Sequence, residues 1–323
     1  MTTGVGIMAL PFYMKELGLL VGALVILLAG SMSYFSFKYI FFAQYYTGKK
    51  DIVEITRRFV PKWMVSVFTY SLLVDVLSSF QIYCLVSWNL FSYLLNMFGF
   101  IKKEWIKDFD TLKLYEYNPS VFLMRACFLH AIFFLSIPLL LKRSLESLKF
   151  VSIGFMISLL LVILCLFSQM PLFYKEYHNP KTPETNTKVS LLYKPFWNLK
   201  FFSYLFSIIL AFYVQPFVMS LRKELLVPSM KRLKKVARIS VGFELVLFIT
   251  LGSVAYIVFG DKYTTDLIIL RKPLDKYTAF EWVFKILLIF FFLMNTLGIP
   301  TFNVPMRDMI IRKYNSIRNS GKI

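Results

Sequence analysis

The segment TTGVGIMALP at Thr2–Pro11 opens an apolar stretch that continues to Tyr46. The charged residues within that stretch are Lys15, Glu16 and Lys38. One crossing of a ~30 Å hydrocarbon core takes ~20 residues of helix, so the stretch is too long for a single span. The tetrapeptide KELG within it supplies a polar turn that ends in a helix-stopping glycine. We therefore predict a short first helix near 4–16 and a second near 19–45.

The rest of the chain has the same apolar character. Of its 323 residues, 58% are hydrophobic and 17% are charged, whereas soluble domains carry about 25% charged residues. Further spans are expected near 65–99, 119–141, 150–172, 198–221, 237–259 and 279–304. We therefore predict an all-α polytopic membrane protein with about eight transmembrane helices. This composition excludes soluble enzymes, disordered chains and disulfide scaffolds.

The cysteines and histidines give no sign of a metal site or a disulfide framework. The cysteines, Cys84, Cys127 and Cys165, lie in apolar segments and form no CxxC pair. The chain has only 2 histidines, which is too few for a histidine-rich metal centre. We expect no bound metal and no cofactor.

The formal net charge of +19 indicates how the chain is oriented. In a soluble protein this excess would suggest nucleic-acid binding, but in a membrane protein basic loops facing anionic lipid explain it better. The loops at the ends of the even-numbered spans carry more Lys and Arg than the opposite loops. We therefore predict that the N-terminus faces the cytosol. The amphipathic segment 51–63 fits a helix lying along the cytosolic interface.

Two spans contain residues that interrupt helices. Gly4, Gly6 and Pro11 weaken the first span, and Pro216 interrupts the sixth, near Ala211. Such interruptions free backbone groups that are tolerated only where they are buried in protein or line a cavity. A small-residue packing face and an ordinary proline kink are the alternatives. Because spans one and six open successive five-span blocks, the pair favours an inverted-repeat transporter.

Four motifs support this prediction with a family resemblance. GVGIMALP with KELG, the loop motif LRKEL at 221–225, AYIVFG at 255–260 and PMRD at 305–308 occur in that order. Together they resemble the amino acid/auxin permease family of the amino acid–polyamine–organocation superfamily, most closely its neutral and vacuolar amino acid transporter branches. The resemblance covers nearly the whole chain and implies a carrier with about eleven spans in two inverted five-span repeats and a final helix.

The resemblance implies one transmembrane transporter domain over residues 1–323. Its parts are a first repeat at about 1–172, an extracytosolic loop at about 173–197, a partial second repeat at about 198–304 and a cytosolic tail at 305–323. The chain starts three residues before Gly4 and stops after the eighth span. We expect a truncated gene model, a reduced protein or a partner that completes the second repeat.

The resemblance also implies where the substrate binds. The carboxylate of an amino acid would meet backbone amides near Gly4 and Gly6, and its amine would meet carbonyls near Ala211 and Phe212. The substrate-binding residues expected on this basis are Thr3, Gly4, Val5, Gly6, Ile7, Ala211, Phe212 and Tyr213. Coupling would be to protons or to sodium.

Ionisable residues within spans are costly, and this makes them candidates for coupling. Asp75 and Glu244 could bind and release a proton. The alternative for each is an ion pair near a helix end, and Arg238 is the obvious partner for Glu244. Asn295 and Thr296 could offer oxygen ligands to sodium, or could instead make interhelical hydrogen bonds.

The function that we expect is secondary active transport of amino acids by alternating access around broken helices 1 and 6. A non-transporting amino acid sensor or receptor, or a truncated remnant of a carrier, is the alternative. A membrane-embedded enzyme is disfavoured because the polar residues are scattered. The partners would be an amino acid substrate and the lipid bilayer, with no nucleic acid. The membrane would be the plasma membrane or a vacuolar or lysosomal one.

Overall fold

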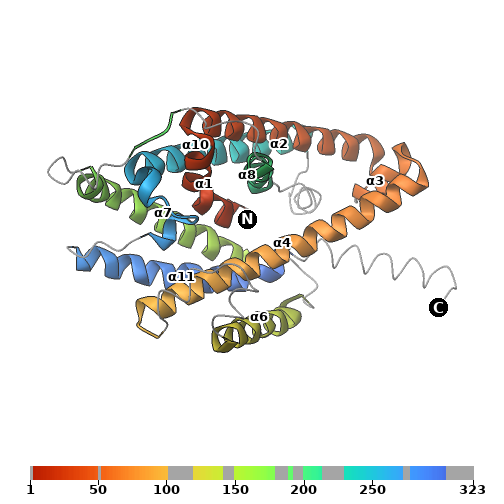
Figure 1. The fold of residues 1–323 in the computed structure, drawn as a ribbon. Coiled ribbons are helices and arrows are strands. Elements are labelled where there is room, and N and C mark those ends of the chain that lie inside the picture. Colours follow the sequence, from red (N-terminus) through yellow and green to blue (C-terminus); the bar gives the residue numbers. More distant parts are fainter. Residues whose placement is uncertain are drawn as a thin grey trace. The chain divides into compact units, whose positions relative to one another are not determined.

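The protein is helical throughout the part of the chain that the structure describes. The computed structural model describes residues 3–49, 52–100, 119–140, 149–178, 188–191, 199–212, 229–271 and 277–302. The helices are α1 (Thr3–Leu17), α2 (Leu19–Thr47), α3 (Ile52–Phe59), α4 (Lys62–Met97), α6 (Pro119–Leu140), α7 (Lys149–Tyr177), α8 (Leu199–Ala211), α10 (Met230–Tyr263), the 3₁₀ helix η5 (Ile268–Leu270) and α11 (Thr278–Phe302) (Figure 1).

Each predicted span overlaps one of these helices, and residues 213–221 of the sixth predicted span lie outside the described residues. Within the described ranges, the segments long and apolar enough to cross a membrane are Leu19–Thr47, Lys62–Met97, Phe150–Tyr177, Met230–Tyr263 and Thr278–Ile299. The apolar helices at Leu123–Leu135 and Phe201–Ala211 are shorter. The prediction of an all-α polytopic membrane protein is therefore confirmed.

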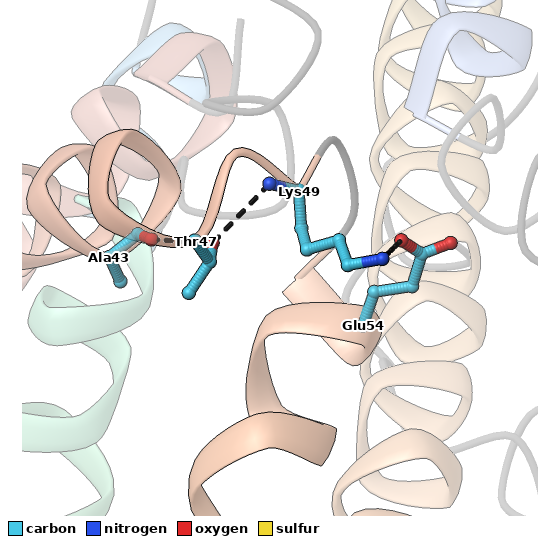
Figure 2. Close-up of polar contacts among 4 residues, drawn as sticks. All are labelled: Ala43, Thr47, Lys49 and Glu54. Carbon is cyan, nitrogen blue, oxygen red and sulfur yellow. Dashed lines mark hydrogen bonds and ion pairs between the residues drawn. The ribbon is translucent and has the colours of Figure 1, made fainter.

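A tight turn joins α2 to the amphipathic helix α3. Gly48 ends α2 with a φ of 66°, a left-handed conformation that a side chain would strain, and its N–H donates to Gln44. Figure 2 shows the adjoining contacts: the Thr47 hydroxyl donates to the Ala43 carbonyl at 2.6 Å, and Lys49 Nζ lies 3.8 Å from Glu54 Oε2. A helix is present at Ile52–Phe59, within the segment predicted to lie along the interface.

The chain divides into two compact units. Unit 1 comprises Met1–Ser66 and Ile163–Thr278, and unit 2 comprises Val67–Val162 and Ala279–Ile323. Unit 1 therefore combines α1 and α2 with α8 and α10, the helices that open the two predicted repeats. Unit 2 combines most of α4, all of α6 and the first half of α7 with α11. Each unit thus takes helices from corresponding positions of the two predicted repeats.

Two predictions about helix boundaries are wrong. The first helix is continuous from Thr3 to Leu17 with Pro11 inside it, so its glycines lie in the opening turns and do not break it. The physical reason is that amides in a first turn have no intrahelical acceptor, so nothing is lost by placing glycines there. The expected loop at 173–197 begins too early, because α7 continues through Pro171 to Tyr177. Most of that loop and the tail at 305–323 lie outside the described residues.

The start of α10 also differs from the prediction. We expected the span to begin near residue 237, but the helix begins at Met230. Ser229 is its N-cap, and the serine hydroxyl accepts a hydrogen bond from the Arg232 N–H at 3.3 Å. The basic residues that follow Ser229 therefore lie on the first turns of a helix and not in a loop.

Candidate functional site

Helix α1 is the centre of unit 1, where it packs against α2, α8 and α10. Leu10 and Met14 are among its fully buried side chains. Glycines on the neighbouring helices make room for them. A Cβ atom added at Gly252 of α10 would lie 3.4 Å from Leu10 Cβ, and one added at Gly22 of α2 would lie 2.6 Å from Met14 Sδ. The backbones of α2 and α10 therefore approach α1 closely, and this packing holds the apolar helix on two sides.

The two segments predicted to be interrupted meet at the contact between Gly6 and Ala211. A Cβ atom added at Gly6 would lie 2.8 Å from Ala211 Cβ and 3.3 Å from Ala211 Cα. Such a separation leaves no space for any side chain at position 6. The start of α1 and the end of α8, about 200 residues apart in the sequence, are thus in direct contact.

The end of α8 is a turn that is held by α2 and α10. The Phe212 N–H donates to the Ile209 carbonyl at 3.1 Å, which is the tighter spacing typical of a helix end. The Phe212 carbonyl accepts a hydrogen bond from the buried Ser33 hydroxyl at 3.0 Å. The Phe212 ring lies 4.8 Å from the ring of Phe248. The helix therefore ends at Ala211, where an interruption was predicted, while Tyr213 and Pro216 lie outside the described residues.

The two helix ends at this contact have opposite polarity. Thr3, Gly4 and Val5 form the first turn of α1, where backbone amides point out of the helix without intrahelical acceptors. The last turn of α8 is the carbonyl end of that helix, where Ile209 and Phe212 accept the two hydrogen bonds just described. A helix start favours an anionic group, and a helix end favours a cationic one. Adjacent ends of this kind suit a small zwitterion, and Ile7, fully buried, adds an apolar wall.

Of the four predicted coupling residues, Glu244 belongs to the same unit as this contact. It lies on α10 between Val241 and Phe248, both buried, and so on the buried face of the helix. The Glu244 Oε1 atom is buried and accepts no hydrogen bond from the described residues. Arg238, the partner considered from the sequence, is exposed, and no ion pair joins the two residues.

The other three candidates lie in unit 2. Asn295 is buried, and its Nδ2 donates to the buried Ser87 hydroxyl at 2.8 Å. Asn295 Oδ1 and Thr296 Oγ1 are buried and have no hydrogen-bond partner among the described residues. Asp75 is half-buried on α4, three helical turns before Ser87 and so about 18 Å from it along the helix axis. The interhelical hydrogen bond considered for Asn295 is therefore present.

A polar network that was not predicted from the sequence lies where α10 ends and α2 begins in unit 1. The Tyr256 hydroxyl donates to Asp261 Oδ1 at 2.7 Å and accepts from the Ser190 N–H at 2.8 Å. The Ser190 carbonyl in turn accepts from the N–H of Leu19, at the start of α2, at 3.1 Å. Gly260, with a φ of 57°, kinks α10 and so turns Asp261 back toward Tyr256. The segment 188–191 is thus fastened to α2 and α10.

Replacing Tyr256 by Phe tests this network. The variant loses the hydroxyl that joins Asp261 to Ser190, and we expect the free energy of unfolding to fall by about 1–3 kcal/mol. The segment around Lys188 should become more accessible, so trypsin should cut there faster in the detergent-solubilised protein. Tyr174→Phe, on an exposed face of α7, should leave the cleavage rate unchanged. Equal rates for the wild type and Tyr256→Phe would show that the network does not hold the segment.

A second missed residue is the buried cation Arg271. Its guanidinium donates to the side-chain oxygen of Gln169 on α7 and lies 4.4 Å from the ring centroid of Phe173. Arg271 directly follows η5, which contacts α1. Since Ile268 and Ile269 of η5 are buried, Arg271 anchors to α7 a short segment that packs against α1. In the sequence this arginine looked like an ordinary loop cation, so no signal distinguished it.

Comparison with known proteins identifies the family of the chain. The family model described as transmembrane amino acid transporter protein matches residues 1–322. Searches of curated proteins and of solved structures gave no match. Because the family model covers essentially the whole chain, and the described helices include several that are long and apolar enough to span a membrane, the chain belongs to the transmembrane amino acid transporter family.

Proposed function

We propose that the protein is a secondary active transporter that binds an amino acid where the start of α1 meets the end of α8. The contact between Gly6 and Ala211 carries this proposal. It brings the amide end of one helix next to the carbonyl end of another, and this arrangement matches the carboxylate and the amine of an amino acid. Thr3–Ile7 would contribute the backbone amides, and the backbone carbonyls would come from Ala211, Phe212 and Tyr213.

The division into units supports alternating access as the mechanism. Transporters with inverted repeats work largely by rocking one bundle of helices against another around a fixed site. The helices that open both repeats belong to unit 1, and later helices of both repeats belong to unit 2. Each unit is therefore a body of the kind that such a motion requires.

Energy coupling to protons or to sodium follows from the polar residues within the spans. Asp75 and Glu244 are the candidate proton sites, and Asn295 and Thr296 are the candidate sodium ligands. The excess of Lys and Arg in the loops at the ends of the even-numbered spans favours a cytosolic N-terminus. The membrane would be the plasma membrane or a vacuolar or lysosomal one.

Uptake by proteoliposomes tests the proposal. The purified full chain would be reconstituted and given a radiolabelled mixture of the standard amino acids, with an inward gradient of protons, of sodium or of neither. We expect accumulation above the equilibrium level under one of the two ion gradients. Competition with single unlabelled amino acids would then identify the substrate. Binding without accumulation under either gradient would favour the sensor over the transporter.

A further inference from the structure

The position of Glu244 along α10 can be fixed from contacts on either side of it. Leu245, the next residue, packs against Gly30 of α2, where an added Cβ would lie 2.5 Å from Leu245 Cδ2. Phe248, one turn further, packs against Phe212 of α8. Glu244 therefore lies at the level where α2 and the end of α8 meet α10.

This level is adjacent to the contact between Gly6 and Ala211. Phe212 directly follows Ala211, so Glu244 is separated from that contact by a single turn of α10, about 6 Å along the axis. The order of contacts also fixes the direction. Gly6 of α1 contacts Ala211, whose neighbour Phe212 packs on Phe248 of α10, while Leu10 and Met14 of α1 meet Gly252 further along α10. Helices α1 and α10 therefore run the same way, and Glu244 lies toward the start of α1.

We propose that Glu244 is the group that binds the coupling proton. This inference rests on the proposed function, because it assigns a role at the proposed amino acid site. An ionised Glu244 and the carboxylate of a bound amino acid would be two negative charges near the same helix start, and like charges at short range in a low-dielectric setting repel strongly. A proton taken from water on one side neutralises Glu244 and lets the substrate carboxylate bind, and both leave on the other side.

The surroundings leave this carboxyl group without a permanent neutralising partner among the described residues. Its Oε1 atom accepts no hydrogen bond from them. The titratable or charged groups on the helices packed around it include Tyr34 and Lys38 of α2, Tyr13, Lys15 and Glu16 of α1, Tyr204 of α8, and Lys234 and Arg238 of α10.

None of these groups is placed to form an ion pair with Glu244. Lys38 lies beside the cluster of Phe37, Phe41 and Ala237, about two turns of α10 away, or about 10 Å. Lys234 lies over the ring of Phe42. Lys15 and Glu16, the charged residues of α1, lie near the C-terminal end of that helix and so away from its start. The N-terminal amine is a charge that acts on the ionised Glu244, but no described side chain forms an ion pair with it, so a proton can neutralise the carboxylate.

The experiment is uptake by proteoliposomes with the membrane potential clamped. With one proton per amino acid, a gradient of about one pH unit drives up to about tenfold accumulation of the labelled amino acid mixture in the wild type. Glu244→Gln keeps the shape of the side chain in its neutral form. We expect this variant to lose accumulation entirely while still exchanging labelled for unlabelled amino acids. Glu176→Gln, which removes an exposed carboxylate from the end of α7, should behave as the wild type.

The outcomes separate this inference from the proposed function. If Glu244→Gln retains accumulation, Glu244 does not bind the coupling proton. The same conclusion follows if accumulation is lost in Asp75→Asn and not in Glu244→Gln. Sodium-driven uptake by the wild type without a pH response also overturns the inference, but leaves transport intact. If the wild type exchanges no amino acid, the proposed function itself fails. If Glu244→Gln shows neither accumulation nor exchange, Glu244→Asp provides the test. Exchange by Glu244→Asp without a response to the pH gradient would contradict the inference.

Discussion

Substitution of Gly6 by Leu is expected to abolish amino acid binding by the protein. A Cβ atom at this position would already lie 2.8 Å from Ala211 Cβ, so the longer side chain would push the start of α1 away from the end of α8. Leucine favours a helix more than glycine does, so α1 itself should not be weakened. Saturation binding of the radiolabelled amino acid mixture to the purified protein would measure the loss, which we expect to exceed about a hundredfold in affinity, or about 2.7 kcal/mol.

The matched control is Gly242→Leu. Gly242 lies on the exposed side of α10 in the same unit, and an added Cβ there meets nothing within 4 Å. The same chemical change at this position should leave binding intact. Binding that is unchanged in Gly6→Leu would remove the contact between α1 and α8 from the substrate site.

The second large effect is expected from Arg271→Ala. Removing the guanidinium leaves the buried side-chain oxygen of Gln169 without this donor and takes the cation from the ring of Phe173. A hydrogen bond to a charged group and a desolvated cation–π contact together amount to about 2–4 kcal/mol. Thermal unfolding of the detergent-solubilised protein should therefore shift to a clearly lower temperature. Because Arg271 follows η5, the segment that packs against α1 should also loosen.

Two variants separate this effect from a general loss of charge. Arg271→Lys keeps the positive charge but lacks the planar donor group, so it should recover part of the stability. Arg238→Ala removes an exposed arginine from α10 and should have almost no effect. An unfolding temperature unaffected by Arg271→Ala would mean that the anchor contributes little.

The spans could be predicted from the sequence because their physical signal is local. An apolar run long enough to cross a hydrocarbon core identifies a span without knowledge of its neighbours. The amphipathic helix within 51–63 could be predicted in the same way, because amphipathic periodicity is also a local signal. The juxtaposition of Gly6 and Ala211 was expected only through the inverted repeat and the family resemblance.

Other features required knowledge of which helices touch. The hydroxyl of Ser33 resembles many others in an apolar span, and only its distance from the Phe212 carbonyl reveals that it holds the end of α8. Arg271 and Tyr256 were missed for the same reason. The predicted break in α1 failed because glycine and proline lower helix propensity without forbidding a helix, and packing against α2, α8 and α10 outweighs that preference.

The most direct test of the account is counterflow in proteoliposomes that contain the full chain and no ion gradient. Vesicles loaded with unlabelled amino acids would be diluted into a trace of the labelled mixture. A carrier that alternates its access exchanges the two, so we predict a transient accumulation of label inside the vesicles that Gly6→Leu abolishes. Label that binds to the protein without entering the vesicles would contradict the account and identify a sensor.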